Sequence, residues 1–147
     1  MPPKFSLQTV LDVRHIRVEG LEIELGDLLT AQQEALVMLA SLHSNLRGVF
    51  AMLHQAQSGE LDLFAINHLH ANVRDLQARI AQVEAALRIL EEKIENKRNE
   101  LVSAKQAEET LQTLKKKEID RYKTELALYE NKQQDDVYIS QGFRNKQ

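Results

Sequence analysis

Apolar side chains recur along almost the whole chain at alternating steps of three and four residues, which constrains its fold more than any other feature. The first series has fourteen positions, twelve of them apolar: Leu11, Arg14, Val18, Leu21, Leu25, Leu28, Gln32, Ala35, Leu39, Leu42, Leu46, Val49, Leu53 and Ala56. The second also has twelve apolar positions of fourteen: Ile66, Leu69, Val73, Leu76, Ile80, Val83, Leu87, Leu90, Ile94, Lys97, Leu101, Ala104, Glu108 and Leu111. Such spacing specifies helices that pack along one seam as a left-handed coiled coil.

One convincing break separates the two series, in the stretch QSGELDLF between Gln57 and Phe64. Ser58 and Gly59 supply the reversal of direction, and Asp62 is a suitable N-cap for the helix that follows. We therefore predict a single coiled-coil domain over residues 1–147, with its parts bounded as follows: a helix at 5–57, a turn at 58–62, a helix at 63–137 and a flexible tail at 138–147.

Three further glycines, Gly20, Gly26 and Gly48, lie inside the apolar rhythm of the first helix. A lone glycine in a helix costs about 1 kcal/mol relative to alanine and does not by itself end the helix. The chain has only five glycines and two prolines, so it can make few reversals of direction. These counts agree with two long helices rather than with many short elements.

The two series match each other when the chain is folded back near residue 61. Each position then faces one whose number completes a sum of 122, so Leu11 faces Leu111, and Arg14 faces Glu108. An arginine that meets a carboxylate inside a seam keeps its charge satisfied and disfavours slipped registers. We therefore predict an all-α fold in which two long helices form an antiparallel left-handed coiled-coil hairpin, with Arg14 and Glu108 as its register pair.

In this register the second helix is longer than the first and overhangs it beyond Lys117. The overhang is about 20 residues, or about 30 Å at 1.5 Å per residue. A narrow apolar stripe restarts on it at Ile119, Tyr122, Leu126 and Tyr129. Because an unpartnered apolar stripe is unfavourable in water, we expect another molecule to cover it.

The first helix carries more apolar residues than its seam needs. The extra residues lie on its flanks and outer face: Ile16, Ile23, Leu29, Leu36, Val37, Met38, Phe50 and Met52. The corresponding flanks of the second helix are polar, and a two-stranded coil requires only its seam. The extra width predicts a docking face for another protein or for another copy of the chain.

Sites for catalysis, metals or cofactors are not expected. The sequence contains no Gly-rich phosphate loop, no zinc-protease or hydrolase motif and no cysteine. His54, His68 and His70 are near the turn, but His68 and His70 are two apart on a helix and do not share a face. Rod-like helices also offer no pocket for general acid–base chemistry. We predict a protein that is not an enzyme, without metal or cofactor.

Charge and hydropathy limit the partners and the location. The net charge of −3 gives no argument for nucleic acid, and Lys115–Lys117 is the only concentrated cation. The longest apolar run, at residues 35–42, is too short to span a bilayer, and the N-terminus lacks the apolar core of a signal peptide. We therefore expect a soluble, cytosolic protein.

Four segments resemble the flagellar FliJ family. Residues 5–14, FSLQTVLDVR, resemble its FxLQxVLDxR opening, and residues 97–102, KRNELV, resemble its KRxELV stretch. Residues 111–115, LQTLK, are similar to its LxxLK, and residues 130–136, ENKQQDD, to its ExKxxDE run near the C-terminus. The order and spacing of these segments extend the resemblance over nearly the whole chain.

The resemblance implies a small component of the flagellar type III export apparatus, and hence a role in motility. Family members form a two-helix coil similar to the stalk subunit of rotary ATPases. They are thought to sit in the pore of the hexameric export ATPase and to connect it with the cytoplasmic domain of the membrane export gate. The chain would then be cytoplasmic and attached to the inner face of the membrane only through partners. Export chaperones are a further class of partner, expected for some relatives.

We assign the two partners to the two unpartnered surfaces. The candidates for contact with the ATPase are on the overhang: Lys115, Lys116, Lys117, Ile119, Tyr122, Leu126 and Tyr129. The candidates for contact with the gate are on the first helix, nearer the turn: Leu36, Met38, Phe50 and Met52. Two alternatives stay open from the sequence: a self-associating structural coiled coil, and a stalk subunit of a virulence secretion system or of a rotary ATPase.

Overall fold

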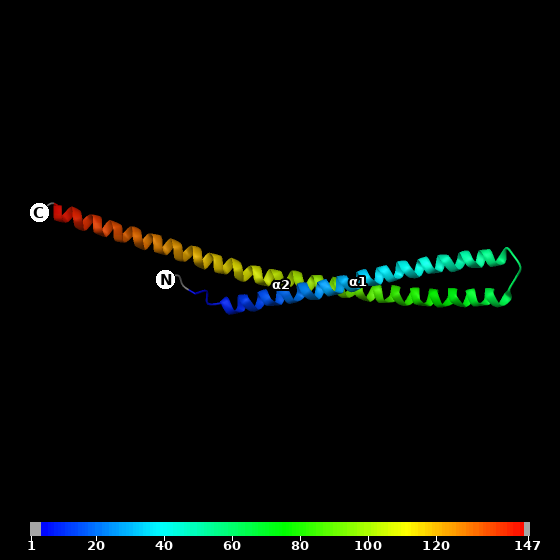
Figure 1. The fold of residues 1–147 in the computed structure, drawn as a ribbon. Helices are drawn as coiled ribbons and strands as arrows, with labels where there is room; N and C mark the ends of the chain where they lie inside the picture. The colour runs from blue at the N-terminus through cyan, green and yellow to red at the C-terminus, as the bar shows by residue number, and fades with distance from the viewer. Residues whose placement is uncertain (1–3, 146–147) are drawn as a thin grey trace. The chain divides into compact units, whose positions relative to one another are not determined.

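The computed structural model describes residues 4–145, which form two α-helices joined by one turn (Figure 1). Helix α1 spans Gln8–Gln57 and helix α2 spans Leu63–Asn145. No strand occurs within residues 4–145. The prediction of an all-α helical hairpin is confirmed.

The turn between the helices is closed by hydrogen bonds from side chains at both of its ends. The Ser58 hydroxyl donates to the carbonyl oxygens of His54, at 3.3 Å, and Gln55, at 3.0 Å, at the end of α1. Asp62 Oδ1 accepts hydrogen bonds from the backbone N–H groups of Phe64, at 3.1 Å, and Ala65, at 3.2 Å. These are the N2 and N3 donors that a helix N-cap satisfies, so the predicted capping role of Asp62 is confirmed.

The outer ends of the helices differ from the prediction. α1 begins at Gln8 rather than at residue 5, because a tight turn precedes it in which the Gln8 N–H donates to the Phe5 carbonyl oxygen at 3.0 Å. α2 continues to Asn145, so residues 138–145 are helical where a flexible tail was expected. This stretch contains no proline, and Gly142 alone costs too little to end the helix.

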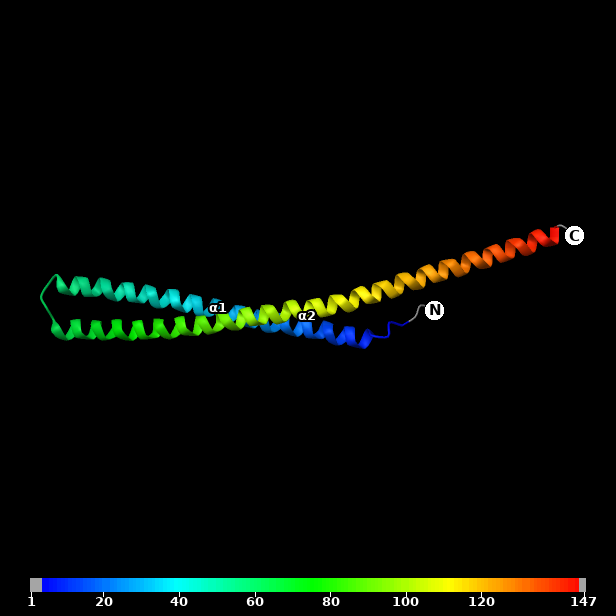
Figure 2. The same ribbon diagram turned by 180° about the vertical axis from the view of Figure 1, so that it is seen from behind.

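The chain divides into two compact units, and each unit contains one stretch of either helix. Unit 1 comprises Met1–Glu19 and Val102–Gln147, and unit 2 comprises Gly20–Leu101, including the turn. Within each unit the stretch of α1 runs antiparallel to the stretch of α2 (Figure 1 and Figure 2). The organisation as a single domain stays a prediction.

The packed seam follows the two predicted series residue by residue. All 28 of their positions are buried or half-buried. The buried hydrophobic side chains of the described part of the chain all belong to these series: Leu11, Val18, Leu21, Leu42, Leu53, Val73, Ile80, Leu87, Ile94 and Leu111. Leu21 is the most deeply buried of them, at 1 % exposure. Burial of this stripe from water is the main stabilisation of helices this long.

In unit 1, α2 extends well past the end of α1. Every residue from Lys116 to Phe143 is exposed except Tyr122, which is half-buried. The predicted overhang is therefore present, and we call residues 116–143 the arm. The arm lacks a helix partner within the described chain, so any apolar stripe on it faces solvent.

Candidate partner-binding surfaces

A cluster of charged and polar side chains connects the two helices of unit 1. His15 Nδ1 lies 2.7 Å from Glu108 Oε1, and His15 Nε2 lies 2.8 Å from Glu19 Oε1. The hydrogen bond and the negative charge of Glu108, helped by the charge of Glu19, raise the pKa of His15 above its ordinary value of 6.5. The cluster favours a protonated imidazole held between two carboxylates.

The predicted register pair meets in a different way from the one expected. Arg14 Nη1 donates to the backbone carbonyl oxygen of Ala107 at 2.7 Å, while the carboxylate of Glu108 is occupied by His15. Within residues 4–145 no ion pair joins Arg14 to Glu108, so the expected contact is wrong at the level of atoms. Glu108 pairs with His15, the residue after Arg14, and Arg14 reaches the carbonyl group of the residue before Glu108.

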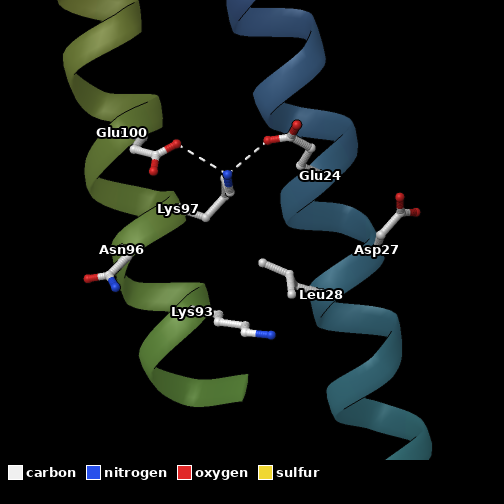
Figure 3. Close-up of a pocket in the computed structure, with 7 residues that line it drawn as sticks. All are labelled: Glu24, Asp27, Leu28, Lys93, Asn96, Lys97 and Glu100. Atoms are coloured by element: carbon white, nitrogen blue, oxygen red, sulfur yellow. Dashed lines mark hydrogen bonds and ion pairs between the residues drawn. The ribbon is translucent and has the colours of Figure 1, made fainter. Parts of the chain in front are cut away.

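Unit 2 contains a second polar link, formed by a lysine in the seam. Lys97 Nζ lies 2.9 Å from Glu24 Oε2 on α1 and 3.2 Å from Glu100 Oε2 on its own helix (Figure 3). The hydrogen bond to Glu24, followed by that to Glu100, raises the pKa of Lys97. Arg14–Ala107, His15–Glu108 and Glu24–Lys97 are contacts between the helices, and each joins residues whose numbers add up to within one of 122.

A groove opens between the helices of unit 2 where Lys97 replaces an apolar seam residue. Its volume is about 550 Å³, and its lining residues are Glu24, Asp27, Leu28, Lys93, Asn96, Lys97 and Glu100. In Figure 3 the Lys93 side chain extends towards α1 beside Leu28, whereas Asn96 and Asp27 point away from the space between the helices. The groove is open and carries charges of both signs, which suits charged side chains of a protein partner.

The residues predicted to contact the ATPase are together on the arm and next to its start. Lys115 and Tyr122 are half-buried and Lys116 and Lys117 are exposed. The exposed fractions of Ile119 and Leu126 are 41 % each, and that of Tyr129 is 60 %. Ile119, Tyr122, Leu126 and Tyr129 are spaced by three, four and three residues, so they share one face of α2. This arrangement is the one expected of a surface that receives another helix.

The four residues predicted to contact the gate are exposed but do not form one patch. Leu36 and Phe50 are fourteen residues apart and lie on one flank of α1. Met38 and Met52 are also fourteen apart and lie on the other flank. Val37, between the two flanks, is exposed as well. A partner must use one flank or wrap around the outer side of α1.

Two groups of exposed apolar residues were missed by the sequence prediction. One is at the turn, where Leu61, Leu63 and Phe64 are exposed; among the described residues Phe64 is the most exposed large hydrophobic one, at 84 %. The other is near the end of the arm: Val137, Tyr138, Ile139 and Phe143. The sequence alone could have identified both groups, because their residues are apolar and lie outside the 3–4 series.

The length and apolar composition of α1 raise the question of whether this helix could span a membrane. By length and composition α1 could cross a bilayer. However, its seam residues are packed against α2, which carries charged residues along most of its length.

Within the described residues, no group of three or more His, Cys, Asp or Glu side chains is placed to hold a metal ion.

A helical hairpin with one helix longer than the other and an apolar seam between them defines a two-helix coiled-coil protein. A family model described as the flagellar FliJ protein matches residues 3–147, and the chain belongs to this family. It is therefore a structural component connected with flagellar protein export. Neither the comparison with curated proteins nor that with solved structures found a match.

Proposed function

We propose that the chain is a stalk of the flagellar export machinery that binds the hexameric export ATPase through its arm and the cytoplasmic domain of the export gate through α1. The observation that carries the proposal is a stripe on the arm, beyond the end of α1, in which Ile119, Leu126 and Tyr129 are exposed and Tyr122 is half-buried. A solvated helix without a binding role gains nothing from apolar residues at this spacing. Lys116 and Lys117, exposed beside the stripe, would be attracted to acidic side chains in the pore of the ring.

The effect on ATP hydrolysis tests the role of the arm. Replacing Leu126 with Asp introduces a charge into the stripe and should abolish stimulation of the purified ATPase. Leu128 is a matched control, because it is an exposed leucine on the same helix but lies outside the stripe. Leu128→Asp should therefore stimulate like the wild type, and circular dichroism should show unchanged helicity for both variants. Full stimulation by Leu126→Asp would overturn the assignment.

For the gate we propose the flank with Leu36 and Phe50 in preference to the flank with Met38 and Met52. An aromatic side chain provides a larger and more rigid contact than a methionine, and aromatic residues dominate binding energy at many interfaces. Binding of the purified cytoplasmic domain of the gate should be lost in Phe50→Asp and kept in Met52→Asp. The opposite result would move the site to the other flank.

The same proposal gives the location. The chain would be cytoplasmic and would reach the membrane through the gate, with the apolar outer side of α1 used for protein contact. The match to a flagellar family favours this host over a virulence secretion system or a rotary ATPase. Export chaperones, as a further class of partner, would use exposed apolar residues outside the stripe.

A further inference from the structure

The stripe on the arm is flanked by charges in a self-complementary order. Ile119, Tyr122, Leu126 and Tyr129 occupy the inner positions of a heptad pattern. The flanking positions are filled by charged residues: Lys116, Glu118, Lys123, Glu125, Glu130 and Lys132. Such flanking charges set partner choice and orientation in coiled coils.

When two arms pair antiparallel, each inner residue faces an inner residue from a different position of the second copy. Ile119 then faces Tyr129 of the second copy, and Tyr122 faces Leu126 of the second copy. All four inner positions are filled by apolar or aromatic side chains in both chains. The stripe is therefore complementary to itself in this orientation.

The flanking charges agree with the same register. Glu118 meets Lys132 of the second copy, and Lys116 meets Glu130 of the second copy. By symmetry each of these attractive pairs occurs twice. Two pairs of like charge are unfavourable, and each occurs once. Lys123 faces Lys123 of the second copy, and Glu125 faces Glu125 of the second copy. The carboxylate of Glu125 lies 3.7 Å from Arg121 Nε of its own helix, which reduces the second repulsion.

A parallel pair is less favourable. There Glu118 would meet Lys123 of the second copy, but Glu125 would meet Glu130 of the second copy, and each would occur twice. The numbers of attractive and repulsive charge pairs would then be equal in the parallel dimer. In the antiparallel dimer there are twice as many attractive charge pairs as repulsive ones. We propose that the arm of the free protein pairs with the arm of a second copy as an antiparallel coiled coil.

The proposal does not rest on the proposed function, since it concerns only copies of this chain. If both hold, the dimer hides the stripe that the ATPase would bind. Self-association and binding to the ATPase would then exclude each other, and the free protein would keep its apolar stripe covered until the ring is available.

Sedimentation of the full chain over a range of concentrations tests the dimer. We expect a monomer–dimer equilibrium that Leu126→Asp abolishes and Leu128→Asp leaves unchanged. A wild-type chain that stays monomeric would overturn the proposal, and so would a dimer that survives Leu126→Asp. Neither result depends on the ATPase, so failure here is separate from failure of the proposed function.

Charge reversal tests the register. Lys132→Glu turns two attractive meetings into repulsive ones and should raise the dissociation constant of the dimer about tenfold. Adding Glu118→Lys to Lys132→Glu restores opposite charges and should return the constant to near the wild-type value. A dimer that is indifferent to Lys132→Glu, or weakened further by the second change, would contradict the register.

Cross-linking tests the orientation, because the chain has no cysteine of its own. In the antiparallel pair Glu125 lies beside Glu125 of the second copy, whereas Tyr129 is ten residues along the helix from Tyr129 of the second copy. Glu125→Cys should therefore be joined efficiently by a short bismaleimide, and Tyr129→Cys should not. The reverse pattern would show a parallel pair and overturn the proposal.

Discussion

His15 on α1 and Glu108 on α2 are joined across the hairpin by a contact of 2.7 Å between Nδ1 and Oε1. The other ring nitrogen of His15 contacts Glu19, one turn further along α1. A single imidazole thus connects two helices and two carboxylates near the outer end of the paired part of unit 1. Its charge state affects how firmly the first turns of α1 are held.

This contact predicts that stability falls as the pH rises past the ordinary pKa of a histidine. The folded-state pKa of His15 is raised above the unfolded value of 6.5, mainly by Glu108. The contribution of His15 is therefore complete below pH 6.5 and is lost as the pH rises through the raised folded-state pKa. Urea unfolding at several pH values should show this loss in the wild type and not in His15→Gln. An equal slope in both proteins would contradict the assignment.

The seam predicts a sharp contrast between two neighbouring apolar residues. Leu21 is 1 % exposed and Ile23 is 66 % exposed. Leu21→Ala should lower the free energy of unfolding by about 2–5 kcal/mol, because it removes buried methyl groups and leaves a cavity. Ile23→Ala should change it by no more than about 0.5 kcal/mol. Chemical denaturation of both variants measures the difference.

Lys97 predicts that an ion pair can be replaced with a gain in stability. Its side chain is 23 % exposed in a seam position, and its ion pair with Glu24 is partly solvated, so the pair contributes little to stability. Burying a leucine there would contribute about 1.5–3 kcal/mol. Lys97→Leu should therefore raise the free energy of unfolding by about 1 kcal/mol. Lys93→Leu, outside the seam, is the control and should show little change.

The glycines of α1 predict a second route to higher stability. Gly20 and Gly26 are helical, and a Cβ atom added at either would meet nothing within 4 Å. Replacing each with Ala should add about 0.5–1 kcal/mol, because alanine has less backbone freedom to lose on folding. Thermal unfolding should show a rise of several degrees for the double variant.

Much of the fold could be predicted from the sequence because it depends on spacing alone. The 3–4 pattern located every seam position, and Asp62 followed from the chemistry of N-caps. The end of α2 could not be predicted in this way, since a solvated helix leaves no hydrophobic pattern to mark where it stops.

The candidate surfaces were predictable only in part. Apolar residues outside the seam identified the arm and the outer side of α1, but not the division of α1 into two flanks. The contact of Glu108 with His15 rather than Arg14 depends on side-chain direction, which a register does not specify. Phe64 was missed because it lies in the first turn of α2, before the apolar series of that helix begins at Ile66.

The single turn at residues 58–62 also fixes the order in which the chain can fold during synthesis. Leu53 and Leu69, on either side of it, leave the ribosome close together, whereas Leu11 must wait for Leu111, 100 residues later. At 5–20 residues per second, that wait is about 5–20 s. Throughout it the first-made helix displays its apolar stripe without its own partner, so a nascent chain of this design depends most on protection early in translation.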